Sequence, residues 1–315
     1  TSQAGTFRRI SVSQETSFTP KDHGPIIGKH PLPIHTVKKA ERELNETPET
    51  REREIANLRA IIEKRVQEAT DEDKVEATGV RTRFASTSDA ELIKFLRARK
   101  FDAEKAYTLM KGYVKYSIKH PDVVGNVRES DVRQWMGKGR PGVLPTRDAH
   151  GRVILFFRLD GWDPEEFPFT EVMQCFVYVL EKLLESEETQ INGVCLVEDF
   201  SGYTLNHVSA VGINEYRQMI DMLQGSFPCR FKGIHCIRQP WFFAKAFGLI
   251  QPFLKAKLFE RIHVLGEDLD PFFNEFKKDF LPEELGGTGA AYDGKALANM
   301  LFGPKKDDED EDTAL

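Results

Sequence analysis

The chain has 315 residues, of which 40% are hydrophobic and 30% are charged, a balance typical of a globular protein with room for one large and one smaller domain. The net charge of -6 is concentrated in residues 307–312, which are all acidic, so the rest of the chain is formally neutral. A neutral body argues against nucleic acid as the main partner, because phosphate binding needs an excess of basic residues.

Residues 1–36 are predicted to form an extended, partly disordered leader. They are rich in small polar residues and in helix breakers such as Pro20, Gly24, Pro25 and Pro33. A segment of this composition has too little apolar surface to offset the entropy of ordering a chain. We therefore expect the first folded unit to begin near residue 37.

A helical module is predicted over residues 37–128. From about residue 37 to 69 the composition turns to Glu, Arg and Ala, and residues 70–87 form a polar connector. Apolar residues at helical spacing mark the first stretch: Ile55, Leu58, Ile61, Ile62 and Val66.

Two further helices of this module have recognisable ends. Ser88 and Glu91 form a capping box directly before an apolar run, which predicts a helix start. Asp102 is a suitable N-cap for the next helix, and Pro121 ends that helix because it cannot continue the hydrogen-bond ladder.

After Gly142 the pattern changes to short apolar strands that alternate with helical stretches. The predicted strands are 152–159, 193–200, 231–237 and 261–265, and the helical stretches lie near 170–188, 205–223 and 241–259. Strands separated by helices predict an α/β fold with a mostly parallel sheet. We assign residues 129–303 to this domain and residues 304–315 to an acidic tail.

Signatures of catalysis and of metal binding are missing from the sequence. The nearest match to a phosphate loop, residues 137–142, lacks the Lys-Ser/Thr ending and precedes a strand, so a turn is predicted instead. The histidines are not at metal-ligand spacing, and the four cysteines form no Cys-x-x-Cys pair. We expect no catalytic residue, metal or cofactor. Without a secretory or membrane-spanning run, a cytoplasmic location is expected.

One carboxylate stands out among the predicted strands. Glu198 shares a strand face with Val194, Leu196 and Phe200, and a carboxylate on an apolar face must be paired, hydrogen-bonded or protonated. Two interpretations remain open: an internal salt bridge, or a polar anchor for the head of an apolar ligand. Phe157, on another apolar strand face, suits either a core or a pocket wall.

The apolar stretch 241–254 and the cations near it are also ambiguous. Its apolar character is typical of an interior helix, but Pro252 gives a physical reason for a hinge. Arg230 and Lys232 share a strand face, and Lys257 and Arg261 are four residues apart. Each cation alone is an ordinary surface charge, whereas arginine and lysine together suit phosphate.

Two long segments resemble a known family. Residues 92–102, LIKFLRARKFD, resemble the helical N-terminal module of CRAL-TRIO proteins. Residues 225–235, GSFPCRFKGIH, followed by QPW at 239–241, PFL at 252–254 and LPEELGG at 281–287, are similar to the core of the family's lipid-binding domain. The resemblance covers roughly residues 85–303, and implies a lipid-binding domain of α/β class behind a small all-α module, acting as a carrier and not as an enzyme.

Further matches resemble the family's retinoid carriers, in residues 5–8, 21–25, 180–193 and 313–315. They imply a visual-cycle carrier of 11-cis-retinal or 11-cis-retinol whose ligand-binding residues are Phe157, Phe176, Glu198 and Met222. Phe176 stands where those carriers have a tyrosine, and Tyr178 cannot replace it because two helical residues differ by about 200° around the axis. The alternatives are a phosphoinositide-coupled transfer protein for tocopherol or phospholipid, and an enzyme acting on a lipid through Glu198 and a histidine.

The same resemblance implies partners and moving parts. It makes 241–254 a mobile gate over the pocket that meets the membrane when open, with Trp241, Phe242, Phe243, Phe247 and Phe253 as its aromatic residues. It makes Arg230, Lys232, Lys257 and Arg261 a basic cleft for phospholipid headgroups on an anionic membrane. Thr313 and Leu315 form a C-terminal pattern that PDZ domains bind, and we expect a monomer.

Overall fold

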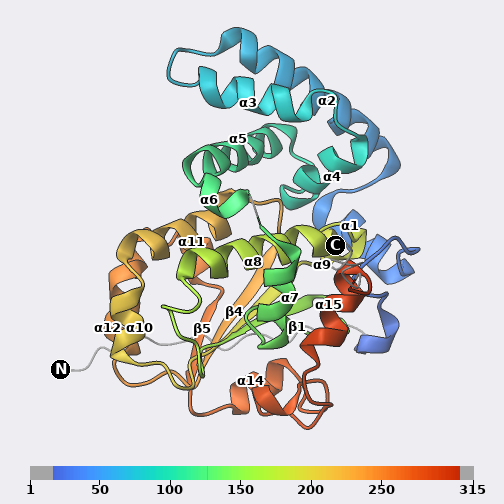
Figure 1. Cartoon of the computed structure of the whole chain (residues 1–315). Coiled ribbons are helices and arrows are strands. Elements are labelled where there is room, and N and C mark those ends of the chain that lie inside the picture. Colours follow the sequence, from blue (N-terminus) through green and yellow to red (C-terminus); the bar gives the residue numbers. More distant parts are fainter. Residues whose placement is uncertain (1–16, 126, 306–315) are drawn as a thin grey trace, which may run out of the picture.

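The computed structural model describes residues 17–125 and 127–305. The predicted PDZ ligand, Thr313 and Leu315, the acidic run before it and the matched residues 5–8 lie outside these ranges. Figure 1 shows a small helical unit lying on a larger unit that is built around a sheet. The helices of the small unit are α2 (Pro48–Glu68), α3 (Lys74–Phe84), α4 (Asp89–Ala98) and α5 (Ala103–Lys119).

The described part of the predicted leader is packed against the larger unit. It forms the 3-10 helix η1 (Pro20–Asp22) and enters α1 (Ile34–Leu44), and Ile26 is completely buried. The expectation of a partly disordered leader is therefore wrong for residues 17–36. The reason lies far along the chain: the buried carboxylate of Glu188 accepts hydrogen bonds from His23 Nδ1 at 2.9 Å and His30 Nε2 at 3.0 Å.

The helical module differs from its prediction in two places. The stretch from 37 to 69 is divided into α1 and α2, because Asn45 adopts a left-handed φ of 60° and Pro48 begins a new helix after the N-cap Thr47. The supposed connector 70–87 contains α3. This helix was missed because only Ala77, Val80 and Phe84 of it are buried, a sparse apolar face within a polar sequence.

The predicted helix ends of the module are confirmed. Ser88 accepts a hydrogen bond from the backbone N–H of Glu91 at 3.3 Å, and Asp102 accepts one from that of Lys105 at 3.0 Å. Helix α5 ends before Pro121, which begins the short α6 (Pro121–Val124). Each cap satisfies a backbone donor that has no partner inside its helix.

The larger unit contains a five-stranded sheet in the order β1-β2-β3-β4-β5. The four predicted strands are confirmed as β2 (Val153–Arg158), β3 (Val194–Asp199), β4 (Phe231–Ile237) and β5 (Ile262–Gly266), all parallel. The antiparallel β1 (Gly142–Val143) follows α7 (Glu129–Gly137) and was not predicted. A Cβ on Gly142 would lie 2.1 Å from the Phe156 ring, so only glycine fits there. The predicted α/β class is confirmed.

Each of the three long predicted helical stretches is divided. The first is α8 (Phe169–Leu183) and α9 (Glu187–Asn192), the second α10 (Leu205–Ala210) and α11 (Ile213–Gly225), and the third α12 (Phe243–Ile250), η2 (Gln251–Phe253) and α13 (Ala256–Phe259). Gly212 begins α11 in extended conformation, and Pro252 lies where the third stretch turns. After β5 come α14 (Asp270–Glu275), η3 (Glu283–Leu285) and α15 (Gly294–Phe302).

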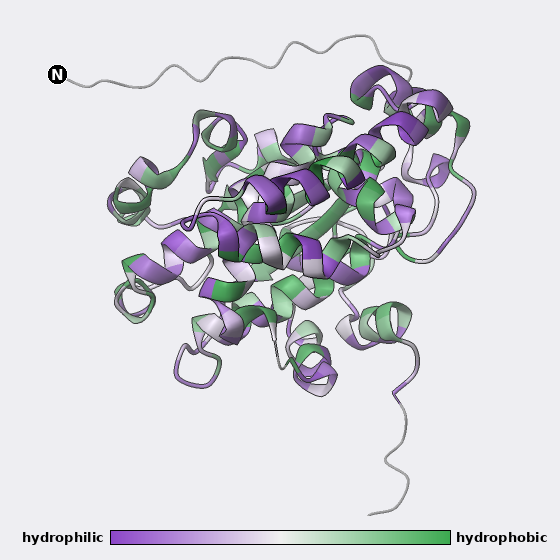
Figure 2. Ribbon diagram, turned by 90° about the horizontal axis from the view of Figure 1, so that it is seen from above, coloured by the Kyte–Doolittle hydropathy of each residue, from purple (hydrophilic) through white to green (hydrophobic). Residues whose placement is uncertain are grey.

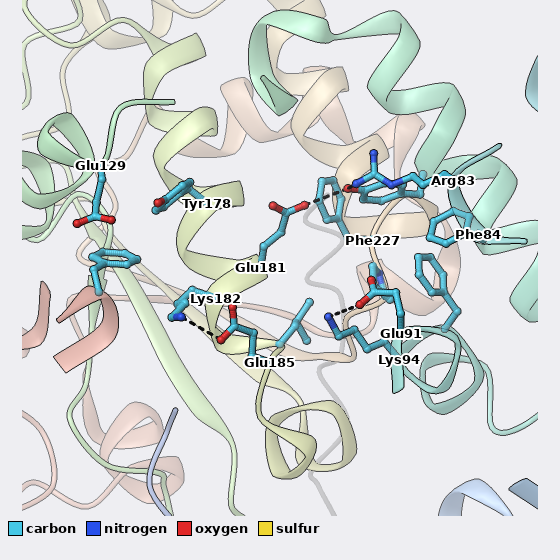
Figure 3. A pocket seen from close by; sticks show the side chains of 15 residues that line it. Arg83, Phe84, Glu91, Lys94, Glu129, Tyr178, Glu181, Lys182, Glu185 and Phe227 are labelled. Atoms are coloured by element: carbon cyan, nitrogen blue, oxygen red, sulfur yellow. Dashed lines mark hydrogen bonds and ion pairs between the residues drawn. The ribbon is translucent and has the colours of Figure 1, made fainter. Parts of the chain in front are cut away.

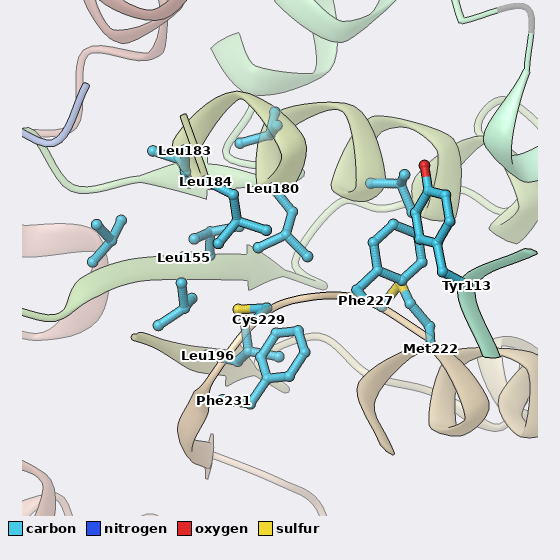
Figure 4. Close-up of a cluster of buried hydrophobic side chains, with 14 of the residues drawn as sticks. Tyr113, Leu155, Leu180, Leu183, Leu184, Leu196, Met222, Phe227, Cys229 and Phe231 are labelled. Atoms are coloured by element: carbon cyan, nitrogen blue, oxygen red, sulfur yellow. The ribbon is translucent and has the colours of Figure 1, made fainter. Parts of the chain in front are cut away.

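The two faces of the sheet have separate apolar clusters. Because side chains alternate along a strand, Leu155 and Leu196 face α8 while Phe156 and Val197 face the opposite side, towards α14. Figure 4 shows the first cluster, in which leucines of α8 lie over β2 and β3. Figure 2 shows the molecule from above, with hydrophobic and hydrophilic residues alternating along the helices. We call the face under α8 and α11 the inner face.

Candidate functional site

Glu198 lies on the inner face of the sheet, near the carboxyl end of β3. Its neighbours in the sheet are Phe157 on β2 and Cys236 on β4, and Val264 on β5 pairs with Cys236. The row that runs across four parallel strands is therefore apolar apart from one carboxyl group. The next row back, Leu155, Leu196, Ile234 and Ile262, is wholly apolar.

The Glu198 carboxyl has neither an ion-pair partner nor a hydrogen-bond donor among residues 17–125 and 127–305. This contradicts the interpretation as an internal salt bridge. Desolvation by burial raises its pKa to about 8, yet its side chain is only half-buried. The carboxyl is thus shielded from bulk water, although part of the residue stays accessible to solvent. Near neutral pH this carboxyl is largely protonated and can donate one hydrogen bond.

The three apolar residues predicted to line the site belong to the cluster on the inner face. Phe157 and Phe176 are half-buried, and Met222 on α11 is almost completely buried. Phe157 makes an edge contact with Trp162 at 5.8 Å between ring centroids. The structure thus brings Phe157, Met222 and Phe176 to one side of the sheet, with Glu198 next to Phe157.

Tyr178 packs against the same cluster at another place than Phe176, beside α15, as the angle between the two helical positions predicts. Its ring lies 5.4 Å from that of Phe302, and Glu129 contributes a hydrogen bond that raises the pKa of its hydroxyl, after the larger effect of burial. The tyrosine expected in the retinoid carriers is therefore not replaced from α8.

Sequence reasoning missed two tyrosines that lie close to the inner face. The hydroxyls of Tyr203 and Tyr216 are 3.1 Å apart. Burial raises the pKa of Tyr216, and the charges of Tyr203 and Glu198 add to the rise. The spacing of Tyr216, Met219 and Leu223 along α11 places them on one helical face, a signal that could have drawn attention to them.

The predicted gate, residues 241–254, lies partly exposed on Phe200 and Tyr203 and is not an interior helix; we call this segment the cover. Phe243 at the start of α12 is buried against Phe200, with ring centroids 4.7 Å apart, and Phe242 stacks on Tyr203 at 5.8 Å. Phe247 lies 5.7 Å from Phe243 and is half-buried. In contrast, Trp241 is 82% exposed and Leu249 is 63% exposed. Large apolar side chains on one short segment are seldom left this accessible to water unless they take part in an interaction.

The end of this cover is held by Gln224 of α11. Its side-chain amide donates to the carbonyl of Phe253 at 3.1 Å and accepts from the backbone N–H of Lys255 at 2.5 Å. Arg217 lies over the Phe253 ring at 4.8 Å. The segment around Pro252 is therefore attached to α11 by polar contacts that can exchange with water, which suits a hinge better than a buried apolar joint.

The four predicted basic residues lie close enough to influence one another. Arg230 donates to the carbonyl of Ile191, and Arg261 donates to that of Phe231. Burial, followed by the charge of Arg230, lowers the pKa of Lys232 to about 8. Burial and the neighbouring Arg261 also lower the pKa of Lys257. These cations therefore repel one another.

A hollow with a volume of about 430 Å³ lies where the helical module meets the larger unit. Figure 3 shows its charged residues, of which Lys182 pairs with Glu185 at 2.9 Å and Lys94 with Glu91 at 2.7 Å, each pair joining residues three positions apart along the chain. Tyr113 donates to Glu181 at 3.0 Å. None of the predicted ligand-binding residues lines this hollow, so it is a joint between the two units.

Two further tests concern metals and membrane spans. Within the described ranges, no group of three or more His, Cys, Asp or Glu is arranged to hold a metal ion. No helix of those ranges is long and apolar enough to cross a membrane. Among the same residues, no histidine shares a hydrogen bond with Glu198.

Comparison with known proteins places the chain in a family. Residues 137–287 match the CRAL/TRIO domain and residues 55–112 the CRAL/TRIO, N-terminal domain. Clavesin-1 of Xenopus laevis is 35% identical over 280 residues, covering 88% of this chain and 80% of that protein. Alpha-tocopherol transfer protein-like of Mus musculus is 35% identical over 273 residues, covering 86% and 75%. Clavesin-2 of Mus musculus is 33% identical over 282 residues, covering 89% and 82%.

The fold and the two matched domains define a lipid-binding protein of α/β class. The chain belongs to the CRAL/TRIO family of lipid-transfer proteins. Of the three relatives, one is named for tocopherol transfer and none for a retinoid.

Proposed function

We propose that this protein is a carrier that encloses one long apolar molecule over the inner face of its sheet and transfers it between membranes without altering it. The observation that carries the proposal is Glu198, a desolvated carboxyl without a hydrogen-bond donor from any described residue. Burying such a group is unfavourable unless a partner arrives, and a ligand with a single terminal oxygen supplies that partner.

Two ligand classes fit this chemistry. A retinoid, 11-cis-retinal or 11-cis-retinol, is supported by the segments that resemble the family's retinaldehyde-binding protein, and by Phe157 and Met222 as walls for a polyene. Tocopherol, or a phospholipid, is supported by the name of a relative and by Phe176, which lacks the hydroxyl of the retinoid carriers. Protonated Glu198 donates to an aldehyde, and ionised Glu198 accepts from an alcohol.

The test is competitive loading. The purified apo protein is incubated with equal amounts of 11-cis-retinal, 11-cis-retinol, α-tocopherol and phosphatidylcholine, and the retained lipid is extracted and identified. Retention of one apolar molecule per chain supports the carrier, and its identity selects the class. A retained retinal should absorb near the free aldehyde and not as a protonated imine. Retention of none of the four would overturn the proposal, and a chemically altered lipid would point to an enzyme.

Ligand release is proposed to occur at an anionic membrane surface. The exposed Trp241 and Leu249 of the cover lie on the same unit as the basic residues. Apolar side chains suit the acyl region of a bilayer, and basic side chains suit its anionic headgroups. Vesicles with anionic lipid should speed release, and added salt should weaken the effect by screening. Charge reversal of both Arg230 and Lys257 should abolish it; unchanged release would remove these residues from the mechanism.

A scaffold interaction is proposed for the C-terminus. Thr313 and Leu315 match the pattern that PDZ domains take by adding a strand and enclosing the last side chain. Deletion of Leu315 should abolish capture by a PDZ domain, and equal capture by the shortened chain would refute the proposal. We expect a monomer in solution, which sedimentation measures directly.

A further inference from the structure

An acidic side chain lies beside two of the predicted basic residues, Arg230 and Lys232. Glu43 of α1 accepts a hydrogen bond from Arg230 Nη2 at 3.3 Å and lies 3.8 Å from Lys232 Nζ. Lys39, one turn earlier on the same helix, is also close enough to affect Glu43. We call Lys39, Arg230, Lys232, Lys257 and Arg261 the basic cluster. Glu43 comes from outside the segment that matches the lipid-binding domain, residues 137–287.

The charges of the basic cluster exceed what Glu43 can neutralise. Burial alone would raise the pKa of Glu43, but Lys232, Lys39 and Arg230 outweigh burial and lower it, so the carboxylate is ionised. Lys232 nevertheless keeps a pKa of about 8 because burial and Arg230 oppose its charge more than Glu43 supports it. One carboxylate therefore stands among cations that still repel one another.

Helix α1 is fastened so that Glu43 stays in this position. Thr36, at the start of the helix, is completely buried and donates to Glu188 at 3.3 Å. Lys39 donates to the carbonyl of His150 at 3.3 Å. Leu44, next to Glu43, is completely buried. The backbone is thus held on both sides of Glu43, while its half-buried side chain can turn towards solvent when an anion arrives.

We propose that Glu43 occupies the place of one phosphate in the basic cluster and makes the protein selective for phosphomonoester groups over groups with a single negative charge. The inference rests on the proposed release at anionic membranes and deepens it. An incoming anion must displace a carboxylate that already holds Arg230 and Lys232. A serine headgroup or a phosphodiester brings one net charge and gains little, whereas a phosphomonoester brings about 1.5 to 2 charges and three strong acceptors.

The shared ligand chemistry is a ring or headgroup carrying phosphomonoesters, either in a bilayer or free in solution. The experiment compares the whole chain with Glu43→Gln, and with Glu41→Gln as a matched control, because Glu41 is an exposed acid of the same helix. Phosphatidylcholine vesicles contain either phosphatidylserine or phosphatidylinositol bisphosphate at equal total charge, and binding is measured by co-sedimentation. Thermal unfolding verifies that the three proteins are equally folded.

The wild type and Glu41→Gln should favour the bisphosphate vesicles. Glu43→Gln should bind phosphatidylserine vesicles about fivefold more tightly, since removing one charge near an anionic surface changes binding by roughly 1 kcal/mol, and its preference should fall. An unchanged preference in Glu43→Gln overturns this inference alone. Failure of the wild type to bind either vesicle overturns the membrane function as well.

Soluble inositol trisphosphate distinguishes the two sources. If it competes with the vesicles, and competes with similar strength for both proteins while only Glu43→Gln gains binding to phosphatidylserine, the phosphorylated ring is sufficient. If it does not compete and the vesicle preference still falls in Glu43→Gln, the headgroup must be presented by a bilayer. If Glu43→Gln binds inositol trisphosphate and phosphatidylserine more tightly than the wild type by the same factor, Glu43 is a general repulsive charge and the proposed selectivity is wrong.

Discussion

Glu188 and Glu198 are ten residues apart and lie at opposite ends of one continuous segment, yet their surroundings differ completely. Glu188, on α9, is completely buried and accepts hydrogen bonds from His23, His30 and the backbone N–H of Gly24, with Arg147 at 3.4 Å. Burial would raise its pKa, but the hydrogen bonds of the histidines and the charge of Arg147 lower it to about 2. Glu198 receives no such donor from the described chain, and burial raises its pKa to about 8.

The difference shows how to separate a structural carboxylate from a binding one. A buried charge is stable only when protein groups replace the water it has lost. At Glu188 the protein itself supplies those groups, and the site is complete. At Glu198 the described residues supply none, so the carboxyl keeps its proton and its unused hydrogen-bonding capacity. The first residue joins two parts of the chain, and the second is the one that we propose binds a ligand.

The largest effect on the free energy of unfolding is expected from removing the charge of Glu188. Glu188→Gln removes the charge that compensates Arg147, and loss of one partner of a buried pair costs about 3 to 5 kcal/mol. Urea unfolding should report this loss, and limited proteolysis should cut the released segment 17–36. Glu185→Gln removes the same charge from an exposed position nearby and should change stability by less than about 0.5 kcal/mol. Equal stability of the two variants would refute the contrast.

At Glu198, in contrast, substitution by Gln is expected to increase the stability of the apo protein. The unfolded chain releases the Glu198 proton near pH 4.5, whereas the folded protein keeps it up to about pH 8, so the apo protein loses stability as pH rises between these values. Glu198→Gln removes that loss and should stabilise the apo protein at pH 7 on the order of 2 kcal/mol. The gain should vanish near pH 4.5. A destabilised variant at pH 7 would mean that Glu198 has a partner in the apo protein.

A smaller effect is expected on ligand release. Raising the pH from 7 to 9 ionises Glu198, which then cannot donate to an aldehyde, and the loss of one hydrogen bond should speed release of bound retinal about fivefold. Glu188 stays ionised throughout this interval, so attachment of the leader through this carboxylate should not change. Release from Glu198→Gln should not depend on pH, because an amide does not titrate. Ligand fluorescence without vesicles measures each rate.

Glu198→Gln also changes the choice between ligands. The amide still donates to an aldehyde but accepts less strongly than a carboxylate from an alcohol. Binding of 11-cis-retinol should therefore weaken about two- to threefold more than that of 11-cis-retinal, a difference of roughly 0.5 kcal/mol. Parallel titrations of the two retinoids measure it. Equal losses would place the ligand oxygen away from Glu198.

The elements that the sequence predicts are those whose cause is local. The alternation around Leu155 and Leu196 produces strands directly, and the caps Ser88 and Asp102 act within three residues. Glu198 was found for the same reason, since a carboxylate on an apolar strand face is visible in a short window. The sequence could not tell a salt bridge from an anchor there, because that choice depends on which distant residues come near.

What could not be predicted depends on long-range polar contacts. The leader has few apolar residues, and beside the buried Ile26 its order comes from donors that converge on Glu188. Glu43 likewise contacts Arg230 only because the fold places α1 beside a residue that lies far along the chain. The Tyr203 hydroxyl, from the loop before α10, meets that of Tyr216 on α11, and the helical spacing that marks Tyr216 does not show that Tyr203 lies beside it.

The contact between His23 and Glu188 also sets an order of assembly. It joins residues 165 positions apart, and the loop-closure entropy of so long a connection favours its formation only after the intervening chain has become compact. The sheet and the helical module contain contacts of much shorter range and should form first. The segment 17–36 is thus placed after the units that it joins, and until then Glu43 has no fixed position beside the basic cluster.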